Sequence, residues 1–252
     1  MSMTIEICPD YEQLRPWVTT IDEVFATGQL LYRGRNEVRL FEHEGRQWVV
    51  KRYKRHDIVK RIVYTFFRKN KARRSYENGL QLLHRGFQTP APVAFMERRS
   101  MGLIAQVYYV CAYTAAQPIR PRLIEQEPFD EALATAYARY VARLHAAGVL
   151  HRDLNPTNVL FYEHEGRFDF ELIDINRMTF YDDPVPKSEC MENLTLFYWL
   201  TPAYRFILKE YARQRGWTDE DVSEAIRVKE RHDRRWIRRK QITHLGKYEV
   251  LH

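Results

Sequence analysis

The sequence has few of the residues that mark secreted, membrane-spanning or disordered chains. Its three cysteines, Cys8, Cys111 and Cys190, are widely spaced and form no C-x-x-C pair, so we expect neither a disulfide framework nor a paired-thiolate metal site. No stretch approaches the roughly 18 uncharged apolar residues that a membrane-spanning helix needs. Ten glycines and eleven prolines in 252 residues argue against long disordered tracts.

The first residues of the chain also lack the pattern of a secretion signal. Glu6 and Asp10 lie where a basic start followed by an apolar stretch would be needed. We therefore expect a cytoplasmic protein whose three thiols are reduced. Apolar residues make up 45% of the sequence, which is enough for the core of one large domain or of two lobes.

The positive charge of the chain is concentrated in two segments. The net charge is +7, and residues 51–74 carry eleven lysines and arginines against Asp57 alone. Residues 227–240 carry eight lysines and arginines against Glu230 and Asp233. A single charge is usually just a solvated surface residue, but two dense clusters favour an anionic partner. Nucleic acid, an acidic membrane surface, and a phosphorylated or carboxylated substrate all fit the charge alone. No recognisable nucleic-acid module occurs, so nucleic acid is not expected as a partner.

The first part of the chain has the pattern of a small sheet with one helix. Short apolar and aromatic segments separated by turn residues predict strands at 30–32, 37–41, 47–51, 103–105 and 106–110. Apolar residues at spacings of three and four predict a helix from 69 to 84, which Gly86 ends. A change to alanine, proline and polar residues then marks a boundary near 112–121.

The second part of the chain has mostly helical patterns. A helix is predicted from 129 to 147, with Leu133, Tyr137 and Leu144 on one apolar stripe and Gly148 after its end. Residues 159–161 and 170–173 predict a hairpin. The remainder, from about 193 to 239, is predicted to be largely helical.

A loop that follows the 129–147 helix carries the most informative pattern. Asp153 and Asn158 lie five residues apart on this loop, and Asp174 follows an apolar strand shortly afterwards. Transfer of a phosphoryl group needs a carboxylate that accepts the hydroxyl proton, together with oxygen donors that hold Mg²⁺. We interpret Asp153 as the proton acceptor and Asn158 and Asp174 as the metal ligands.

The string His-Arg-Asp-Leu at 151–154 resembles the protein-kinase catalytic loop, and Asp174 resembles its metal-binding aspartate. Lys51 ends a strand, Val-Val-Lys, that is similar to the kinase strand whose lysine holds the α- and β-phosphates of ATP. Such a lysine needs a carboxylate to aim it, and Glu77, in the middle of the predicted helix, is the candidate. The resemblance therefore implies three catalytic residues, Asp153, Lys51 and Glu77.

The same resemblance implies a fold and a nucleotide site. The fold would be α+β and two-lobed: an antiparallel β-sheet N-lobe with one αC-type helix at 1–111, and a mostly helical C-lobe at 112–252, together forming one kinase-like domain. ATP and Mg²⁺ would be the cofactors. The residues implied to contact the nucleotide, in addition to Lys51, are Gly34, Arg35, Val110, Ala112 and Asn155.

Departures from the protein-kinase pattern narrow the resemblance. No G-x-G-x-x-G occurs near Gly34, Asp174 is followed by Ile-Asn in place of Phe-Gly, and no A-P-E follows it. The stretch 177–190 is too short for a regulated activation loop. With its H-x-D-L-N-x-x-N loop, the chain is similar to the lipopolysaccharide kinases, the Kdo kinase and heptose kinase relatives of bacteria.

That family implies transfer of the ATP γ-phosphate to a sugar hydroxyl of the lipopolysaccharide inner core, on the Kdo or heptose of a lipid A precursor. The partner would be an anionic glycolipid, met in peripheral contact with the cytoplasmic face of the inner membrane. Two alternatives stay open. One is a small-molecule kinase of the aminoglycoside type or an atypical protein kinase. The other is a non-catalytic pseudokinase that binds anionic membrane or nucleic acid.

Overall fold

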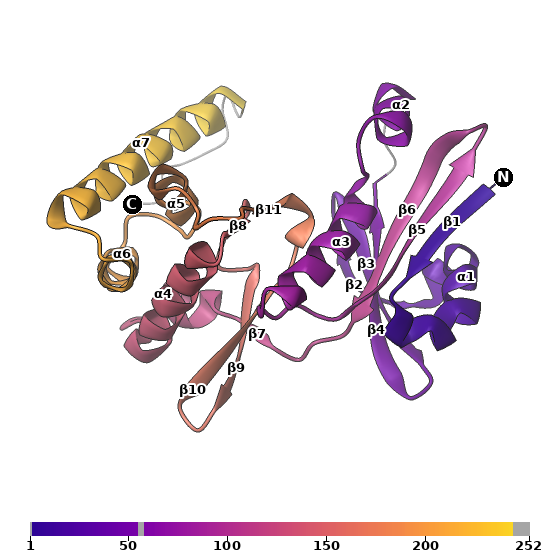
Figure 1. The fold of residues 1–252 in the computed structure, drawn as a ribbon, viewed down its shortest axis with the longest axis horizontal. Helices are drawn as coiled ribbons and strands as arrows, with labels where there is room; N and C mark the ends of the chain where they lie inside the picture. Colours follow the sequence, from indigo (N-terminus) through magenta and orange to yellow (C-terminus); the bar gives the residue numbers. More distant parts are fainter. Residues whose placement is uncertain (1, 55–57, 244–252) are drawn as a thin grey trace. The chain divides into compact units, whose positions relative to one another are not determined.

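The computed structural model describes residues 2–54 and 58–243, which form two compact units (Figure 1). The first unit contains residues 2–116 together with Glu171–Met178, and the second contains Gln117–Phe170 and the residues from Thr179 onward. The sequence predicted one boundary, between 111 and 112. The structure differs in that the segment carrying Asp174 belongs to the first unit, because it packs against that unit's helix and strands.

The first unit is built on a six-stranded sheet in the order β1-β5-β6-β4-β3-β2, and every neighbouring pair is antiparallel. Its strands are β1 (Ser2–Ile7), β2 (Gln29–Arg33), β3 (Asn36–His43), β4 (Arg46–Tyr53), β5 (Pro92–Ser100) and β6 (Leu103–Ala112). Its helices are the 3₁₀ segments Pro9–Leu14, Phe25–Thr27 and Ile175–Arg177 and the α-helices α1 (Arg15–Val24), α2 (Ile58–Phe66) and α3 (Lys71–His84).

Alternation along the strands gives the sheet two apolar faces, because successive side chains of a strand point to opposite sides. Val50 and Tyr108 pack with Val18 of α1 on one face, whereas Tyr53 and Tyr109 pack near α3 on the other. Figure 1 shows α1 and α3 on opposite sides of the sheet. Lys51 alternates with Val50 and therefore shares the α3 face with Tyr53.

Several predicted elements of this unit are confirmed, and others need correction. The strands expected at 30–32, 37–41 and 47–51 are present within β2, β3 and β4, and α3 begins after Asn70, whose side chain accepts a hydrogen bond from the Arg73 amide at 3.0 Å. The two strands expected at 103–105 and 106–110 form the single strand β6. The elements β1, β5, α1 and α2 have no counterpart among the predicted ones.

The second unit is mostly helical, as its sequence predicted. Its elements are β7 (Gln117–Pro118), the π-helical turn Pro121–Glu125, α4 (Glu131–Ala146), β8 (Val149–His151), β9 (Val159–His164), β10 (Arg167–Leu172), β11 (Met178–Phe180), α5 (Lys187–Leu194), α6 (Pro202–Arg215) and α7 (Asp219–Thr243). The expected hairpin is formed by β9 and β10, which turn at Glu165 and Gly166 with φ of 51° and 75°. Within the described residues, no helix is long and apolar enough to cross a membrane.

A buried histidine joins three helices of the second unit. His145 on α4 is 0% exposed, and its two ring nitrogens lie 2.8 Å from the Tyr211 hydroxyl on α6 and 3.0 Å from Asn193 Oδ1 on α5. The Asn193 oxygen can only accept, so Nε2 carries the hydrogen and Nδ1 accepts from Tyr211. Burial lowers the pKa of His145 to about 4, so the imidazole is neutral in the folded protein.

We predict that stability falls as the pH drops from 7 to 5. The unfolded chain binds a proton at His145 near its ordinary pKa of 6.5, whereas the folded chain does not until about pH 4, so acid favours unfolding within this window. The contribution is about 2 kcal/mol between pH 7 and pH 5. Urea unfolding of the wild type and of His145→Gln at both pH values measures it. An equal pH slope in His145→Gln would contradict the assignment, and His84→Gln, at an exposed histidine, is the control.

Candidate active site

The first unit brings Lys51 and Asp174 into direct contact across 123 positions of sequence. Lys51 Nζ lies 2.6 Å from Asp174 Oδ1, and the two side chains are 18% and 33% exposed. Nζ also lies 5.3 Å from the centre of the Tyr53 ring. Burial opposes the charge on Lys51, but Tyr53 and Asp174 together outweigh it, so the pKa of Lys51 is raised and its ammonium stays charged.

A short backbone turn presents the Asp174 carboxylate. Asp174 has the left-handed conformation, with φ 55° and ψ 41°, at the point where β10 leads into the 3₁₀ turn Ile175–Arg177. Asn176 Nδ2 donates to Asp174 Oδ1 at 2.8 Å, and Asn78 Nδ2 on α3 donates to the Ile175 carbonyl at 2.7 Å. The turn is therefore held both from within and by α3.

The donor set at this turn suits a hard cation that also binds phosphate. Asn176 is buried, and since its nitrogen donates to Asp174, its Oδ1 is fixed on the other side, where it has no hydrogen-bond partner within residues 2–54 and 58–243. A carboxylate and an amide oxygen are ligands that Mg²⁺ accepts, with phosphate and water completing its shell. The same ranges contain no group of three or more His, Cys, Asp or Glu that could hold a metal without such a ligand.

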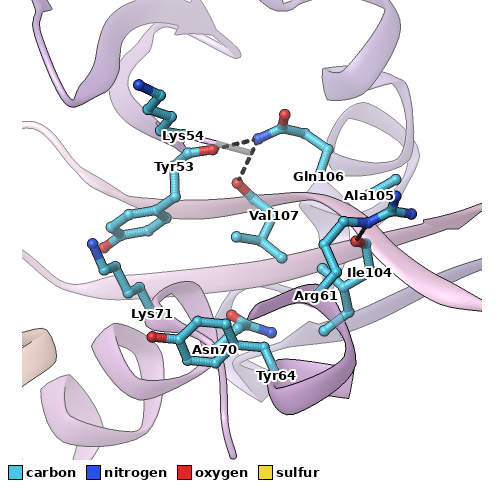
Figure 2. Close-up of a pocket in the computed structure, with 10 residues that line it drawn as sticks. All are labelled: Tyr53, Lys54, Arg61, Tyr64, Asn70, Lys71, Ile104, Ala105, Gln106 and Val107. Carbon is cyan, nitrogen blue, oxygen red and sulfur yellow. Dashed lines mark hydrogen bonds between the residues drawn. The ribbon is translucent and has the colours of Figure 1, made fainter. Parts of the chain in front are cut away.

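Lys71 adds a second cation to the surroundings of Asp174. Burial lowers the pKa of Lys71, Arg177 lowers it further, and Asp174 raises it. Figure 2 shows Lys71 beside Tyr53 at a small pocket on the α3 face of the sheet, where Gln106 Nε2 donates to the Tyr53 carbonyl at 2.7 Å. The pocket has about 20 Å³ of space, enough for about one water molecule. It is therefore too small for a nucleotide.

Glu77 has other partners in this structure. Its carboxylate accepts from Lys69 Nζ at 2.8 Å and from Arg73 Nε at 2.9 Å. These two cations hold the pKa of Glu77 below its usual value although burial raises it. In the described residues Lys51 thus pairs with Asp174, and Glu77 pairs with Lys69 and Arg73. The alignment of Lys51 by Glu77 stays a prediction.

In the second unit, one network of hydrogen bonds gathers the polar residues of the predicted catalytic loop. Asn155 Nδ2 donates to Asp153 Oδ1 at 3.1 Å, and Asn158 Nδ2 donates to the Asp153 carbonyl at 2.9 Å. Asn155 Oδ1 accepts from the Thr157 amide at 3.0 Å. Asp153 is half-buried, so one carboxylate is held in place by the loop and still reaches solvent.

The base of this loop is fixed by the histidine network described above. His151 is buried, and its Nδ1 accepts from the Asp153 amide at 3.1 Å. Asn193 Nδ2 donates to the His151 carbonyl at 2.8 Å, while its oxygen accepts from His145. Arg152 points the other way, where it pairs with Glu189 at 3.1 Å and donates to Thr179 at 2.8 Å. These contacts give His151 and Arg152 structural roles in positioning the loop.

The remaining residues implied to bind the nucleotide lie on the first unit's sheet. Gly34 and Arg35 are exposed in the turn between β2 and β3, where the Gly34 amide donates to the Asn36 carbonyl at 2.9 Å. Ala112 lies half-buried at the end of β6, and Val110 is 0% exposed in the core facing α1. Nucleotide contacts by these four residues stay predictions.

Four residues of these networks had no predicted role: Lys71, Asn78, Asn176 and Asn193. Asn176 and Asn193 act through hydrogen bonds to Asp174, His145 and the His151 carbonyl, and no spacing in the sequence indicates these partners. The signal that could have found Asn78 and Lys71 is their place on the face of α3 that also carries buried Ser75 and Leu82. Their roles depend on a segment about 100 residues away.

The fold of the chain is similar to that of WaaP in complex with acyl carrier protein. The match has a TM-score of 0.63 and 22% identity, and it covers 93% of this chain and 99% of that one. A double mutant of the Mycobacterium tuberculosis PknI kinase domain matches with a TM-score of 0.37 and 20% identity over 59% of this chain and 56% of that one, too weak a likeness to carry an argument. No curated protein sequence matches.

The WaaP match confirms the predicted α+β, kinase-like fold. The model of the lipopolysaccharide kinase (Kdo/WaaP) family matches residues 17–228, which is well over half of the chain and includes β4, α3, the Asp153 loop and Asp174. The chain therefore belongs to the lipopolysaccharide kinase (Kdo/WaaP) family, and it is a phosphotransferase with an alcohol group as acceptor.

Proposed function

We propose that the protein transfers the γ-phosphate of ATP to a sugar hydroxyl of the lipopolysaccharide inner core, on the Kdo or heptose of a lipid A precursor. The observation that carries this proposal is the contact of Lys51 with Asp174, which joins the expected phosphate-binding cation to the expected metal-binding carboxylate at 2.6 Å. Family membership supports the acceptor class.

In this proposal Lys51 holds the α- and β-phosphates, and Asp174 and Asn158 hold the metal, with the Asn176 amide nitrogen fixing the Asp174 carboxylate. Bound Mg²⁺ would neutralise charge on the phosphates. The ion pair between Lys51 and Asp174 supports this role, because the ammonium already faces an anion. Phosphate oxygens arriving with the cation would replace the carboxylate as the partner of this ammonium.

Asp153 is proposed to receive the proton of the acceptor hydroxyl. The bond between that oxygen and the γ-phosphorus forms while the bond from the γ-phosphorus to the bridging oxygen of ADP breaks, and the released proton goes to a carboxylate oxygen of Asp153. Asn155 Nδ2, 3.1 Å from Asp153 Oδ1, keeps the carboxylate in one orientation. The loop thus supplies a proton acceptor, the Asp153 carboxylate, whose orientation is fixed by a neighbouring side chain of the same loop.

Contact with an anionic membrane is supported by the two-sided character of α2. Arg61 and Thr65 face the sheet, where Arg61 Nε donates to the Ile104 carbonyl at 2.7 Å and Thr65 accepts from the Ile104 amide at 3.0 Å. The adjacent positions point outward: Phe66 is 66% exposed and Phe67 is 78% exposed. Exposed aromatic rings beside basic residues on an amphipathic helix are typical of helices that lie in the membrane interface.

We predict that Asp153→Asn lowers kcat by at least about 100-fold, because proton transfer by a positioned base contributes at least that much. Binding of ATP should not change, since the amide is the same size and lies outside the phosphate site. The assay is transfer of labelled phosphate from ATP to a lipid A precursor carrying Kdo and heptose. The control is Asp169→Asn, at an exposed aspartate of β10, which should keep wild-type activity.

A second prediction concerns the metal. Mg²⁺ with ATP should raise the melting temperature of the wild type more than ATP with EDTA does, because a ligand that binds only the folded state stabilises it. Asp174→Asn should lose this additional shift, and Lys51→Met should lose most of the shift from ATP itself. Lys54→Met changes an exposed lysine next to β4 and should behave like the wild type. A Mg²⁺-dependent shift that persists in Asp174→Asn would reject this role.

For the membrane surface, the double variant Phe66→Ser with Phe67→Ser should reduce binding to phosphatidylglycerol vesicles about tenfold, the equivalent of about 1.4 kcal/mol of lost apolar burial. Co-sedimentation measures the effect, and phosphatidylcholine vesicles should bind the wild type weakly because they lack the anionic charge. Met101→Ser removes an apolar side chain that is 98% exposed at another turn and serves as the matched control. Equal loss in both variants would refute the localised contact.

A further inference from the structure

A pocket of about 520 Å³ lies wholly within the second unit, next to the catalytic loop. Its volume falls in the range of small-molecule sites, roughly 300–1,000 Å³. It is formed by three segments that are distant in sequence, with one further side chain. The lining residues are Asn155, Pro156 and Thr157 of the loop, Thr195–Trp199 after α5, Lys229, His232, Asp233 and Trp236 of α7, and Arg120.

Aromatic rings form one wall of this pocket. The Trp199 and Trp236 rings meet edge to face, with centroids 4.9 Å apart and planes at 85°, and Trp236 remains 43% exposed. The Arg120 guanidinium lies 5.5 Å from the centre of the Tyr198 ring. Flat, rigid rings that remain accessible can pack against the C–H face of a sugar ring, and they lose little conformational entropy when they do.

A buried lysine fixes this wall. Lys229 is 1% exposed, and its Nζ donates to the Thr195 carbonyl at 3.1 Å and to Asp233 Oδ1 at 2.7 Å. The same ammonium lies 5.9 Å from the centre of the Trp199 ring. Burial lowers the pKa of Lys229, and Asp233 acts against that shift. Lys229 thus connects α7 to the segment after α5, and its ammonium already has hydrogen-bond partners within the protein.

The polar groups that remain for a ligand match hydroxyls better than a full anion or a hydrocarbon. Asp233 faces the pocket with its charge already balanced by Lys229, and His232 Nδ1 lies 3.2 Å from the same carboxylate. Thr157 adds an exposed hydroxyl on the loop side, which donates to Asn155 Oδ1 and can still accept a hydrogen bond. An acyl chain would remove these groups from water without offering them any new hydrogen bond. Hydroxyl groups, which both donate and accept, satisfy them.

The pocket also adjoins the proposed base. Asn155 lines it and donates to Asp153 Oδ1 at 3.1 Å, so a ligand that touches Asn155 is one side chain away from the carboxylate that receives the proton. The place of the pocket beside Asp153 and the polar groups of its lining therefore both fit a ligand that carries hydroxyl groups.

We propose that this pocket is the acceptor subsite, which binds the sugar ring against Trp199 and Trp236 and holds its hydroxyls through His232, Asp233 and Thr157. The assignment of the bound sugar as acceptor rests on the function proposed above. Binding of a saccharide here does not depend on that function and can be measured separately.

The experiment compares Trp236→Ala with Ile237→Ala. Both side chains are 43% exposed on α7, but only Trp236 lines the pocket, so neither change opens the core and the pair isolates the ring. Free Kdo and free heptose are the probes, with saturation-transfer NMR on the full chain as the readout. We expect Trp236→Ala to weaken saccharide binding at least tenfold and Ile237→Ala to leave it unchanged. His232→Ala is a second test: it should also weaken saccharide binding, while the Trp199 and Trp236 rings stay in place.

Kinetics on the lipid A precursor separate the two proposals. In Trp236→Ala the KM for the acceptor should rise about tenfold with kcat and the KM for ATP unchanged, which is the signature of lost uniform binding. Normal acceptor KM in an active Trp236→Ala enzyme overturns the subsite and leaves the kinase function standing. Saccharide binding that depends on Trp236, without transfer to the precursor, supports the pocket and rejects the acceptor. Binding of myristate in place of either sugar overturns the pocket assignment.

Discussion

The ion pair between Lys51 and Asp174 is the interaction on which the proposed chemistry depends. It joins two parts of the first unit that lie 123 positions apart in the sequence. It requires that β4 present Lys51 on the α3 face and that the turn after β10 present Asp174 in a left-handed conformation. Asn78 on α3 and Asn176 within the turn hold that conformation. A segment that follows the catalytic loop in sequence is thereby packed with the sheet, which explains why the unit boundaries do not follow chain order.

In the second unit, neutral groups hold the Asp153 loop in place. Asn193 bonds to His145 through its oxygen and to the His151 carbonyl through its nitrogen, so a single amide connects the helical core to the base of the Asp153 loop. Because burial keeps His145 neutral, the network avoids the cost of a buried charge. The loop can then hold a half-exposed carboxylate at a fixed position. Lys229 on α7 differs in that it is a buried charge, which Asp233 balances and which joins elements of the pocket wall.

Much of the first unit could be predicted because its signals are local. Strands β2, β3 and β4 alternate apolar and polar residues between turns, and α3 has both its apolar spacing and its capping Asn70. β5 and β6 were harder, since central strands covered on both faces lose the alternation that marks a half-buried strand. The partners of Glu77 illustrate a different limit. Arg73 lies four residues before it on the same helix, a spacing that brings the two side chains together, and the local ion pair forms in this structure.

The sequence by itself determined which chemical groups are available and in what order, because Asp153, Asn155 and Asn158 lie within six residues and their contacts with one another are local. It also determined the family, since that loop and Asp174 form one pattern. Only the tertiary structure decided which partners these groups have. The Lys51 contact with Asp174, the bridge made by Asn193 and the pocket between the loop and α7 all join residues that are far apart in the sequence, by 123 positions in the first case and 42 in the second. Such contacts follow from how sheets and helices pack rather than from any spacing in the chain.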